Sequence, residues 1–451
     1  MVELPVKMFV QGILKQAKES VRAMSCLSSR SKGQVLESMA EALQSQSLEI
    51  LEANERDLEN ISKDLDQQAY RAMLEKVRIS EETVEQMTSG LLTLAGLPDP
   101  IGEVSQAWVT PDGMQVQRVR SPLGVLAVIS DMGPLITVSS FGMCVKTSNV
   151  CVFRGGGEWL ATNGVIVGCL KKVAEAHGLP SGGFVFLDRP SPEAALELVK
   201  HPQYVNAVIP RGKSGLRKGI LDQAKVPVIG YDGGLCHTYV DRDVDLPLAQ
   251  TIVVNGKVQE PLAANALDTL LVHQAPSRHL LPGLIRRLLQ EYRVTLKGCP
   301  ITESMLGMQE MTGHLGIQPA TEADWGTKYQ SLTLNIKVVK DFQEALDHIA
   351  KYAPGHTDTI VTRNYDLAMR FVREVDSSGV LVNASTRLNE CESFGLGPDL
   401  GSNSPHVHHR GPLSLIDLTL EKFVVLGSGQ LKQPHPVPQA YQDAMMLSSK
   451  F

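Results

Sequence analysis

Hydrophobic and polar positions change their spacing several times along the chain. From about Lys7 to Leu94, apolar residues recur at helical intervals, which predicts a layer of amphipathic helices. Between Trp108 and Val119 two short alternating runs flank the turn Pro111-Asp112-Gly113. This pattern predicts a β-hairpin, whose plainest alternative is an ordinary surface loop.

Residues 120–240 alternate strand-like with helix-like stretches. Helical stretches run from Trp159 to His177 and from Ala194 to Lys200. The buried-strand candidates share short apolar runs next to turn residues: Gly124–Ile129, Asn149–Phe153, Gly183–Leu187 and Asn206–Ile209. This order predicts a parallel, doubly wound sheet, the frame that binds dinucleotides at the carboxyl ends of its strands.

A second α/β domain is expected from about Tyr239 onward. A turn at Glu260-Pro261 leads into a small-residue segment and then into Leu270-Leu271-Val272, a run suited to a buried strand. Near the end, Phe423–Leu426 is again strand-like. We expect this late strand to pair with the hairpin.

Composition narrows the class of protein. The 451 residues exceed one small core, so two or three domains are expected. A net charge of -6 argues against non-specific nucleic-acid binding. No apolar run is long enough to span a bilayer, and no signal segment follows Met1. Seven scattered cysteines, an odd number without CxxC spacing, predict reduced thiols in a cytoplasmic protein.

Two glycine clusters each follow a predicted strand. They are Arg154-Gly155-Gly156-Gly157-Glu158 and Ile209-Pro210-Arg211-Gly212. Glycines at such positions let backbone amides approach a pyrophosphate, although each cluster alone also fits a tight strand-to-helix turn. Together, the two clusters support a nucleotide-binding cleft about as well as they support two purely structural turns. Neither a Walker motif nor a GxGxxG fingerprint is present.

Several motifs give the chain a family resemblance. They are Ile50–Glu59, Leu97–Val104, Val258–Val272, Lys351–Thr362, Val382–Arg387, Phe394–Gly397 and His408–Leu413. With the glycine clusters, they resemble gamma-glutamyl phosphate reductase (glutamate-5-semialdehyde dehydrogenase), a branch of the aldehyde dehydrogenase superfamily. The resemblance extends to about Gly427. It implies two doubly wound α/β domains with a β-hairpin oligomerisation flap, and a role in proline biosynthesis.

The expected domain boundaries follow from this resemblance. We expect a dinucleotide-binding-type domain over residues 1–107 and 121–237, and a catalytic-type domain over 238–402. The flap comprises residues 108–120 and 403–427, and residues 428–451 form a C-terminal extension. The family's cofactor is NADP(H), and the residues implied to bind it are Arg154, Gly155, Gly156, Gly157, Glu158, Arg211, Gly212 and Lys328.

The residues implied to carry the reaction are largely replaced. The family loop Gln-Arg-Pro-Ser-Val-Cys-Asn-Ala-Leu-Glu-Thr places its nucleophilic cysteine at Ala264, followed by Asn265. A methyl group cannot form a thioester. In the family's Tyr-Glu-(Ala/Ser)-Arg-Pro-Asn segment only Pro134 survives, because Gly133 and Leu135 replace the Arg and Asn donors.

The family's Trp-x-Thr-Glu-Tyr carboxylate is expected to contact the cofactor ribose, and here it is Lys328. A carboxylate accepts two hydroxyl hydrogen bonds, whereas an ammonium only donates. NADP(H) binding is therefore expected to be weak or lost, unless the ammonium attracts the extra phosphate of NADPH by charge. Three changes around one cleft favour a natural loss of activity over a single engineered substitution.

Two other chemical sites were considered. Cys236-His237 resembles an activated thiol, but neighbours in a strand point to opposite faces and the family carries this pair as part of its frame. The histidines His406, His408 and His409 are weak support for a metal, and we expect none.

Three hypotheses remain at this point. The chain is a non-catalytic family member that binds a glutamate-derived ligand or oligomerises, an active reductase with a substitute for the thiol, or a protein with another activity on the same frame. A homo-oligomer is expected, with no nucleic-acid or membrane partner.

Overall fold

The structure is a computed structural model. It describes residues 5–430 apart from 63–65, 190, 213, 231–233, 308–316, 354 and 407–408. Most of the predicted C-terminal extension therefore lies outside the described residues. None of the described helices is long and apolar enough to cross a membrane.

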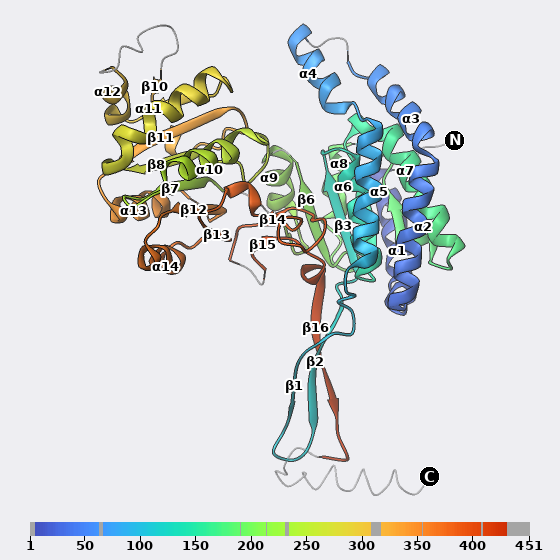
Figure 1. The fold of residues 1–451 in the computed structure, drawn as a ribbon. Helices are drawn as coiled ribbons and strands as arrows, with labels where there is room; N and C mark the ends of the chain where they lie inside the picture. Colours follow the sequence, from blue (N-terminus) through green and yellow to red (C-terminus); the bar gives the residue numbers. More distant parts are fainter. Residues whose placement is uncertain are drawn as a thin grey trace, which may run out of the picture.

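A layer of helices forms the amino-terminal part, as predicted (Figure 1). The helices are α1 (Val6–Ser25), α2 (Ser29–Ser45), α3 (Ser47–Glu59), α4 (Gln67–Val77) and α5 (Glu81–Gly96). The apolar stripe of α1 is buried at Val10, Leu14 and Ala17. Helix α5 begins at a capping box in which the Ser80 and Thr83 side chains each bind the other's backbone. Helices α1, α2, α3 and α5 share one hydrophobic core with the sheet beside them, whereas α4 packs in a separate cluster with Trp159.

That neighbouring sheet is parallel, with the strand order β5-β4-β3-β6. Its strands are β3 (Val125–Ser130), β4 (Val150–Arg154), β5 (Phe184–Phe186) and β6 (Ala207–Arg211). The helices between and after them are α6 (Pro134–Lys146), α7 (Leu160–Ala176), α8 (Pro192–Leu198) and α9 (Ser214–Gln223), with short 3₁₀ turns at η1 (Gly157–Trp159) and η2 (Ser181–Gly183). β3 is buried along its whole length, which explains its continuous apolar run.

The second α/β domain contains a seven-stranded parallel sheet with the order β10-β9-β11-β8-β7-β12-β13. Its strands are β7 (Cys236–Val240), β8 (Thr269–His273), β9 (Thr295–Gly298), β10 (Gln318–Pro319), β11 (Thr333–Val339), β12 (Thr357–Val361) and β13 (Gly379–Val382). The helices around it are α10 (Leu246–Val258), α11 (Gln274–Gln290), α12 (Pro300–Gly307), α13 (Phe342–Tyr352) and α14 (Tyr365–Glu374), with turns η3 (Asp324–Gly326) and η4 (Thr386–Leu388). Separate hydrophobic clusters lie against α10 and α11 and against α13 and α14.

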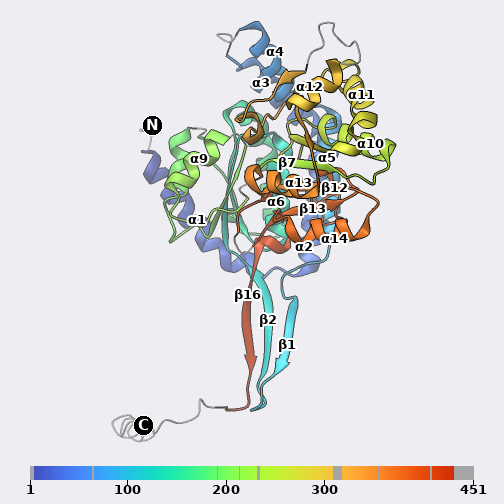
Figure 2. The same ribbon diagram turned by 90° about the vertical axis from the view of Figure 1, so that its left-hand side faces the viewer.

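The predicted flap is a three-stranded antiparallel sheet that extends away from both domains (Figure 2). It consists of β1 (Val104–Val109), β2 (Gln115–Pro122) and β16 (Thr419–Leu426), with β2 in the middle. Gly113 adopts a φ of 87° in the turn between β1 and β2, which suits glycine. The pairing of the hairpin with the late strand is confirmed, because β2 and β16 align from Thr419↔Pro122 to Leu426↔Gln115.

Three expected boundaries need correction. The first segment of the flap is longer than residues 108–120, because β1 begins at Val104 and β2 ends at Pro122. The boundary after residue 237 falls inside β7, because that strand already pairs with β8 and β12 of the catalytic-type sheet. Residues 403–418 are not part of the flap sheet: β14 (Ser402–Asn403) pairs with β15 (Gly411–Pro412), and the turn η5 (Ile416–Leu418) follows. Leu413 and Leu418 of this segment are buried in the core of the expected dinucleotide-binding-type domain, which contains β3 to β6.

Candidate active site

The loop around Ala264 connects α10 to β8. It contains two tight turns, in which Ala263 N–H donates to the Glu260 carbonyl and Ala266 N–H donates to the Ala263 carbonyl. The Ala264 residue is partly exposed, whereas Asn265 is buried. The loop thus leaves Ala264 partly accessible, with a methyl group and no reactive atom.

Lys328 lies against this loop instead of pointing to solvent. Its Nζ donates to the carbonyl oxygen of Ala264 and, over 2.8 Å, to Oδ2 of Asp268. The Sγ atom of Cys236 is 3.7 Å from the same Nζ. All three donors of the ammonium therefore have an acceptor within the protein.

The carboxylate of Asp268 stabilises the ammonium of Lys328 in this position. Its side chain is only 2% exposed, against 23% for Lys328, and its Oδ2 also accepts the backbone N–H of Cys236. Burial by itself lowers the pKa of Lys328, but the charge of the Asp268 carboxylate and its hydrogen bond with the ammonium outweigh burial and raise the pKa above its usual value. Lys328 is thus held as an ammonium at neutral pH.

Cys236 is adjacent to the nucleophile position but is not an activated thiol. Its Sγ donates to the Ala264 carbonyl over 3.4 Å and lies 3.8 Å from Nδ1 of His356. Burial raises its pKa to about 12, although the ammonium of Lys328 works in the opposite direction. Burial also lowers the pKa of His356 to about 3, with Lys328, Arg217 and Arg211 adding to the effect. A neutral imidazole and a protonated thiol do not form a thiolate nucleophile.

His237 points elsewhere, as the strand geometry predicts. Its Nδ1 and backbone N–H both bind Oδ1 of Asp358 on β12, at 2.9 and 3.0 Å. Cys236 and His237 therefore do not act on each other. The prediction that this pair belongs to the frame agrees with their separate partners.

Asn265 is fixed by the segment after β13. Its Nδ2 donates to the carbonyls of Arg387 and Asn389, and the Arg387 guanidinium donates to its Oδ1. The side chain is therefore fully used in holding the loop.

The glycine clusters meet on the other side of the candidate site, at the carboxyl ends of β3, β4 and β6. Asp131 N–H donates to the Arg211 carbonyl, so the turns after β3 and β6 lie together. Gly212 adopts a φ of 126°, and a Cβ there would collide with the Asp131 carboxylate. A Cβ on Gly156 would lie 2.5 Å from Oε2 of Glu158 and 3.4 Å from Cα of Asp131. Gly212 is thus required by its positive φ and by the Asp131 carboxylate, whereas at Gly156 the close atom is the end of the flexible Glu158 side chain.

The start of α7 is not available to an anion. Asp57 of α3 accepts the N–H groups of Ala161 and Thr162, at 2.9 and 2.8 Å. These are the donors that a pyrophosphate would need at that helix. Among the described residues, the amides of Ala161 and Thr162 at the start of α7 are therefore already paired within the protein.

Comparison with other proteins identifies the family. Residues 6–290 match the aldehyde dehydrogenase family. The chain is 38% identical over 430 residues to gamma-glutamyl phosphate reductase of Thermodesulfovibrio yellowstonii, covering 95% of this chain and all of that one. For the enzyme of Heliobacterium modesticaldum the identity is 40% over 418 residues, covering 93% and 97%. The chain belongs to the gamma-glutamyl phosphate reductase family.

Solved structures agree with this assignment. The gamma-glutamyl phosphate reductase of Thermotoga maritima superposes with a TM-score of 0.88 at 34% identity, covering 94% of this chain and all of the other. An acetylating aldehyde dehydrogenase from Geobacillus thermoglucosidasius shares the fold at a TM-score of 0.67 and 16% identity. The predicted aldehyde-dehydrogenase-like α/β fold is therefore confirmed.

The segment after β3 forms the start of a helix. Pro134 occupies the first turn of α6, where its missing N–H costs nothing, and Gly133 precedes it as the N-cap. Leu135 is 38% exposed, so it presents an apolar side chain to solvent at this position. The structure thus gives Pro134 a role in starting α6.

Sequence reasoning missed two residues that complete the site. Asp268, the ion-pair partner of Lys328, could have been found from the sequence. It is an acidic residue four positions after Ala264, and it can neutralise the lysine that stands where a carboxylate is expected. Lys257 could not have been found in this way, because nothing in the sequence shows that its side chain is fully buried with Nζ bound only to the Leu267 carbonyl, 3.0 Å away. Burial lowers the pKa of Lys257 to about 8, although Asp268 opposes the shift.

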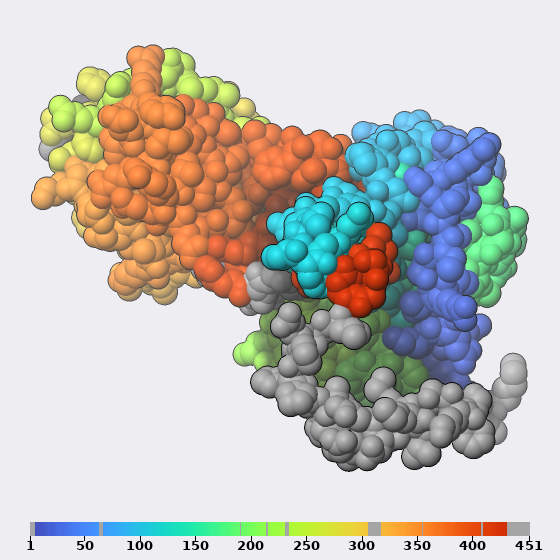
Figure 3. All heavy atoms as spheres, turned by 90° about the horizontal axis from the view of Figure 1, so that it is seen from below, coloured from blue at the N-terminus to red at the C-terminus, as the bar shows by residue number. Residues whose placement is uncertain are grey.

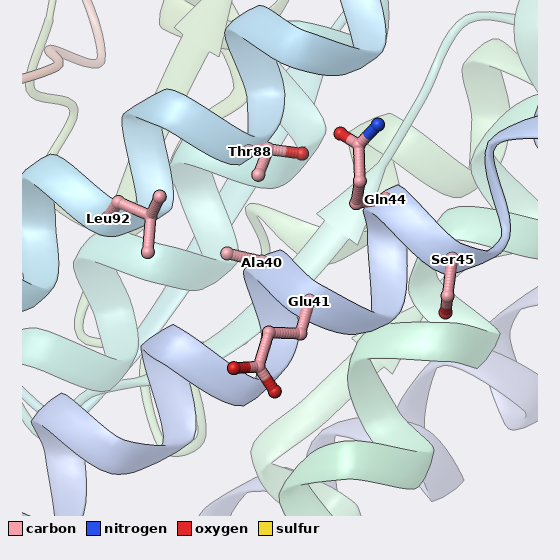
Figure 4. Close-up of a pocket in the computed structure, with 6 residues that line it drawn as sticks. All are labelled: Ala40, Glu41, Gln44, Ser45, Thr88 and Leu92. Atoms are coloured by element: carbon pink, nitrogen blue, oxygen red, sulfur yellow. The ribbon is translucent and has the colours of Figure 1, made fainter.

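Two hollows lie apart from these residues. One, of about 410 Å³, lies between α2 and α5 and is lined by Ala40, Glu41, Gln44, Ser45, Thr88 and Leu92 (Figure 4). The other, of about 460 Å³, lies at the carboxyl ends of β12 and β13 and includes Asp245, Thr362, Arg363 and Tyr365 in its lining. Neither contains a residue that the sequence assigns to catalysis or to the cofactor.

Proposed function

We propose that this chain is a catalytically degenerate member of the gamma-glutamyl phosphate reductase family, which acts by binding a ligand or a partner. The observation that carries the proposal is the pair of substitutions at residues 264 and 328. An alanine stands at the nucleophile position, and an ammonium bound to Asp268 and to the Ala264 carbonyl stands beside it.

The chemistry explains why these changes matter together. Reduction of an acyl phosphate through a thioester needs a thiolate to displace phosphate, donors for the oxyanion, and a hydride from a bound nicotinamide. Ala264 supplies no sulfur, and Gly133 and Leu135 supply no side-chain donors. Lys328 forms an ion pair with Asp268 and is not placed as an acceptor for a ribose hydroxyl.

The part of the candidate site formed by the turns after β3, β4 and β6 fits a dinucleotide better than the loop around Ala264 does. Gly156 and Gly212 keep backbone close to the turns after β3, β4 and β6, and Glu158 retains a carboxylate. Residual NADP(H) binding through the phosphate and adenosine end is therefore expected. Loss of one charged hydrogen bond at residue 328 corresponds to about 1.5 to 3 kcal/mol, or roughly a tenfold to hundredfold weaker affinity.

A titration with NADPH, with and without glutamate semialdehyde, tests this proposal. We expect weaker than micromolar affinity for the chain as it stands and tighter binding after Lys328→Glu. Lys340→Glu is the matched control, because it makes the same charge change on an exposed lysine after β11. Micromolar NADPH affinity, or appreciable reductase turnover, would contradict the proposal.

The alternative is an active NADPH-dependent glutamate-5-semialdehyde dehydrogenase, or an engineered Cys-to-Ala knockout of one. A knockout would differ from an active enzyme only at residue 264. Lys328, Gly133 and Leu135 argue against it, because each removes a further group that the reaction needs.

We further propose a cytoplasmic homo-oligomer that assembles through the flap. The seven cysteines are all free, as expected of a reducing compartment. Within the described part of the chain, the outer strands β1 and β16 of the flap each have an unpaired edge. The two strands also carry exposed apolar side chains: Val104, Trp108, Val109, Leu420, Phe423, Val425 and Leu426. The flap extends away from both domains (Figures 1 and 2), and Figure 3 views it end-on.

Light scattering on a sizing column tests the oligomer. Phe423→Glu is expected to shift the protein towards the monomer, since Phe423 is 65% exposed and contacts Trp108 edge to face. Leu48→Glu, at a 69% exposed leucine on α3, is the matched control and should leave the mass unchanged. A monomeric wild-type protein would refute the oligomer.

A further inference from the structure

His409 lies at the root of the flap, where three parts of the molecule meet. It precedes β15, and its backbone carbonyl accepts a hydrogen bond from Nδ2 of Asn403 in β14. Its ring binds Asp417, which belongs to η5, the turn that leads directly into β16. The ring therefore connects the β14–β15 pair to the start of the last flap strand.

Both ring nitrogens of His409 face acceptors that cannot donate. Nδ1 is 2.6 Å from Oδ1 of Asp417, and Nε2 is 3.1 Å from the carbonyl oxygen of Gly411. A neutral imidazole carries one N–H, so it can serve only one of these partners. The geometry requires an N–H on each nitrogen, which is the imidazolium.

Asp417 is arranged to accept this charge. Its Oδ2 accepts the N–H and the hydroxyl of Ser414, at 2.7 and 2.6 Å, which leaves Oδ1 for His409. The two side chains are only 14% and 15% exposed, so water screens the pair weakly. Burial lowers the pKa of His409, but the Asp417 carboxylate and the Gly411 carbonyl raise it above its ordinary value on balance.

The other charged groups nearby are paired elsewhere. Arg410, the next residue, binds Asp376 and the Ser404 carbonyl. At the flap root, Arg120 of β2 lies between Glu103 and Glu421. Asp399 accepts the backbone N–H groups of Cys391 and Gly401. Among the described residues, Asp417 is thus the charged side chain that contacts the His409 ring.

The segment that carries His409 also contacts both domains. Gly401, just before β14, packs so closely on the Arg211 guanidinium that a Cβ would collide with it. Arg410 reaches Asp376, which follows α14 of the catalytic-type domain. A change in the protonation state of His409 would therefore act on the flap and also on its attachment to the two domains.

We propose that His409 and Asp417 form a proton-dependent latch that fixes the root of the flap. Protonated His409 joins Gly411 to Asp417, and loss of one proton removes one of these two bonds. Because the folded-state pKa is raised, the stabilisation is fully present below about pH 6.5, the ordinary value for histidine, and is lost as pH rises through the folded-state pKa. This inference is independent of whether the chain is an active reductase.

Hydrogen exchange of the β16 amides from Thr419 to Lys422 tests the latch. In the wild-type protein, protection corrected for the intrinsic exchange rate is expected to fall between pH 6 and pH 9, by at most about tenfold per pH unit for one proton. His409→Gln retains a single donor and should show the lower protection at both pH values. The matched control is His406→Gln, since His406 is 71% exposed and pairs with Asp376, and it should follow the wild type.

Equal, pH-independent protection in the wild type and in His409→Gln would overturn the proposal. If His409→Gln does not fold, nitrogen NMR of the wild-type imidazole decides the point. Protons on both His409 nitrogens at pH 6, with one of them lost by pH 9, support the latch, and a single proton at pH 6 refutes it.

Discussion

The loop before β8 and the glycine turns after β4 and β6 have preserved different things. At the turn after β6, Gly212 adopts a φ of 126°, and a Cβ there would collide with the Asp131 carboxylate. In the loop, Ala264 has no reactive atom, and its carbonyl accepts a hydrogen bond from Lys328. Under the proposed function, the steric requirements of the backbone persist in this chain, whereas the groups needed only for the reaction do not.

This contrast predicts that restoring the sulfur will restore reactivity but not turnover. In Ala264→Cys the new thiol lies near the Lys328 ammonium, which lowers a thiol pKa. We expect rapid alkylation of the new cysteine by iodoacetamide at pH 7, while Cys236, whose pKa burial raises to about 12, stays unmodified in the folded protein. Reductase activity should remain at background, because Gly133, Leu135 and Lys328 are unchanged.

A combined variant sharpens the same test. Ala264→Cys with Gly133→Arg, Leu135→Asn and Lys328→Glu should exceed Ala264→Cys alone by at least about a hundredfold in turnover, since single donors are worth roughly that factor. The control variant combines Ala264→Ser with the same three other substitutions. A serine is close in size to a cysteine, but its hydroxyl forms no thioester. Full activity from Ala264→Cys alone would identify an engineered knockout and contradict a natural loss.

The second prediction concerns the ion pair that has taken over the loop. Lys328→Met leaves the Asp268 carboxylate, 2% exposed, without its cation. Breaking a buried pair costs about 3 to 5 kcal/mol, and we expect the lower end because Lys328 is 23% exposed. Urea unfolding measures the loss, and Lys328→Met with Asp268→Asn should recover most of it.

The matched control is a surface ion pair of the same domain. Arg363 and Asp245 are 2.8 Å apart with side chains 62% and 38% exposed, so Arg363→Met should cost less than about 1 kcal/mol. If Lys328→Met is no more costly than Arg363→Met, the charge pair does not hold the loop and the comparison between the two regions fails.

Sequence reasoning reached the architecture because its signals are local or periodic. The hairpin around Gly113, the apolar run of β3 and the strand Phe423–Leu426 are all visible in the order of residues. The boundary within β7 was misplaced because Cys236 and His237 join the second sheet through pairing with distant strands, which no local pattern records. The root of the flap was likewise misassigned, since Leu413 and Leu418 are buried against residues of the first domain.

The candidate site likewise has a part that the sequence predicts and a part that only the tertiary structure shows. Matching residues to a family motif located Ala264, Asn265 and Lys328 together. It gave Lys328 the role of a cofactor contact, whereas the side chain turns inward to Asp268, 60 residues away in sequence. It also supported a phosphate at the glycine turn before α7 about as well as a purely structural turn, whereas the amides of Ala161 and Thr162 at the start of α7 are bound by Asp57, more than 100 residues earlier. Both outcomes depend on side chains that only the tertiary structure brings together.

The last prediction concerns Lys257, which lies beneath the nucleophile loop. Its side chain is fully buried, and burial lowers its pKa to about 8, against 10.5 in the unfolded chain. The folded protein therefore binds fewer protons between pH 8 and pH 10.5, so this group opposes folding below pH 8 and ceases to do so as pH rises through that window. About 2.5 pKa units correspond to roughly 3 kcal/mol at pH 7, and leaving the Leu267 carbonyl unpaired returns about 1 kcal/mol of that.

We thus expect Lys257→Met to stabilise the protein by about 2 kcal/mol at pH 7, with the gain shrinking steadily towards pH 10. Lys257→Arg keeps a charge that does not titrate in this range, so it should be less stable than the wild type, increasingly so at high pH. Urea unfolding at pH 7, 8.5 and 10 measures both variants. A gain from Lys257→Met that is the same at all three pH values would show that packing, and not the buried charge, accounts for the change.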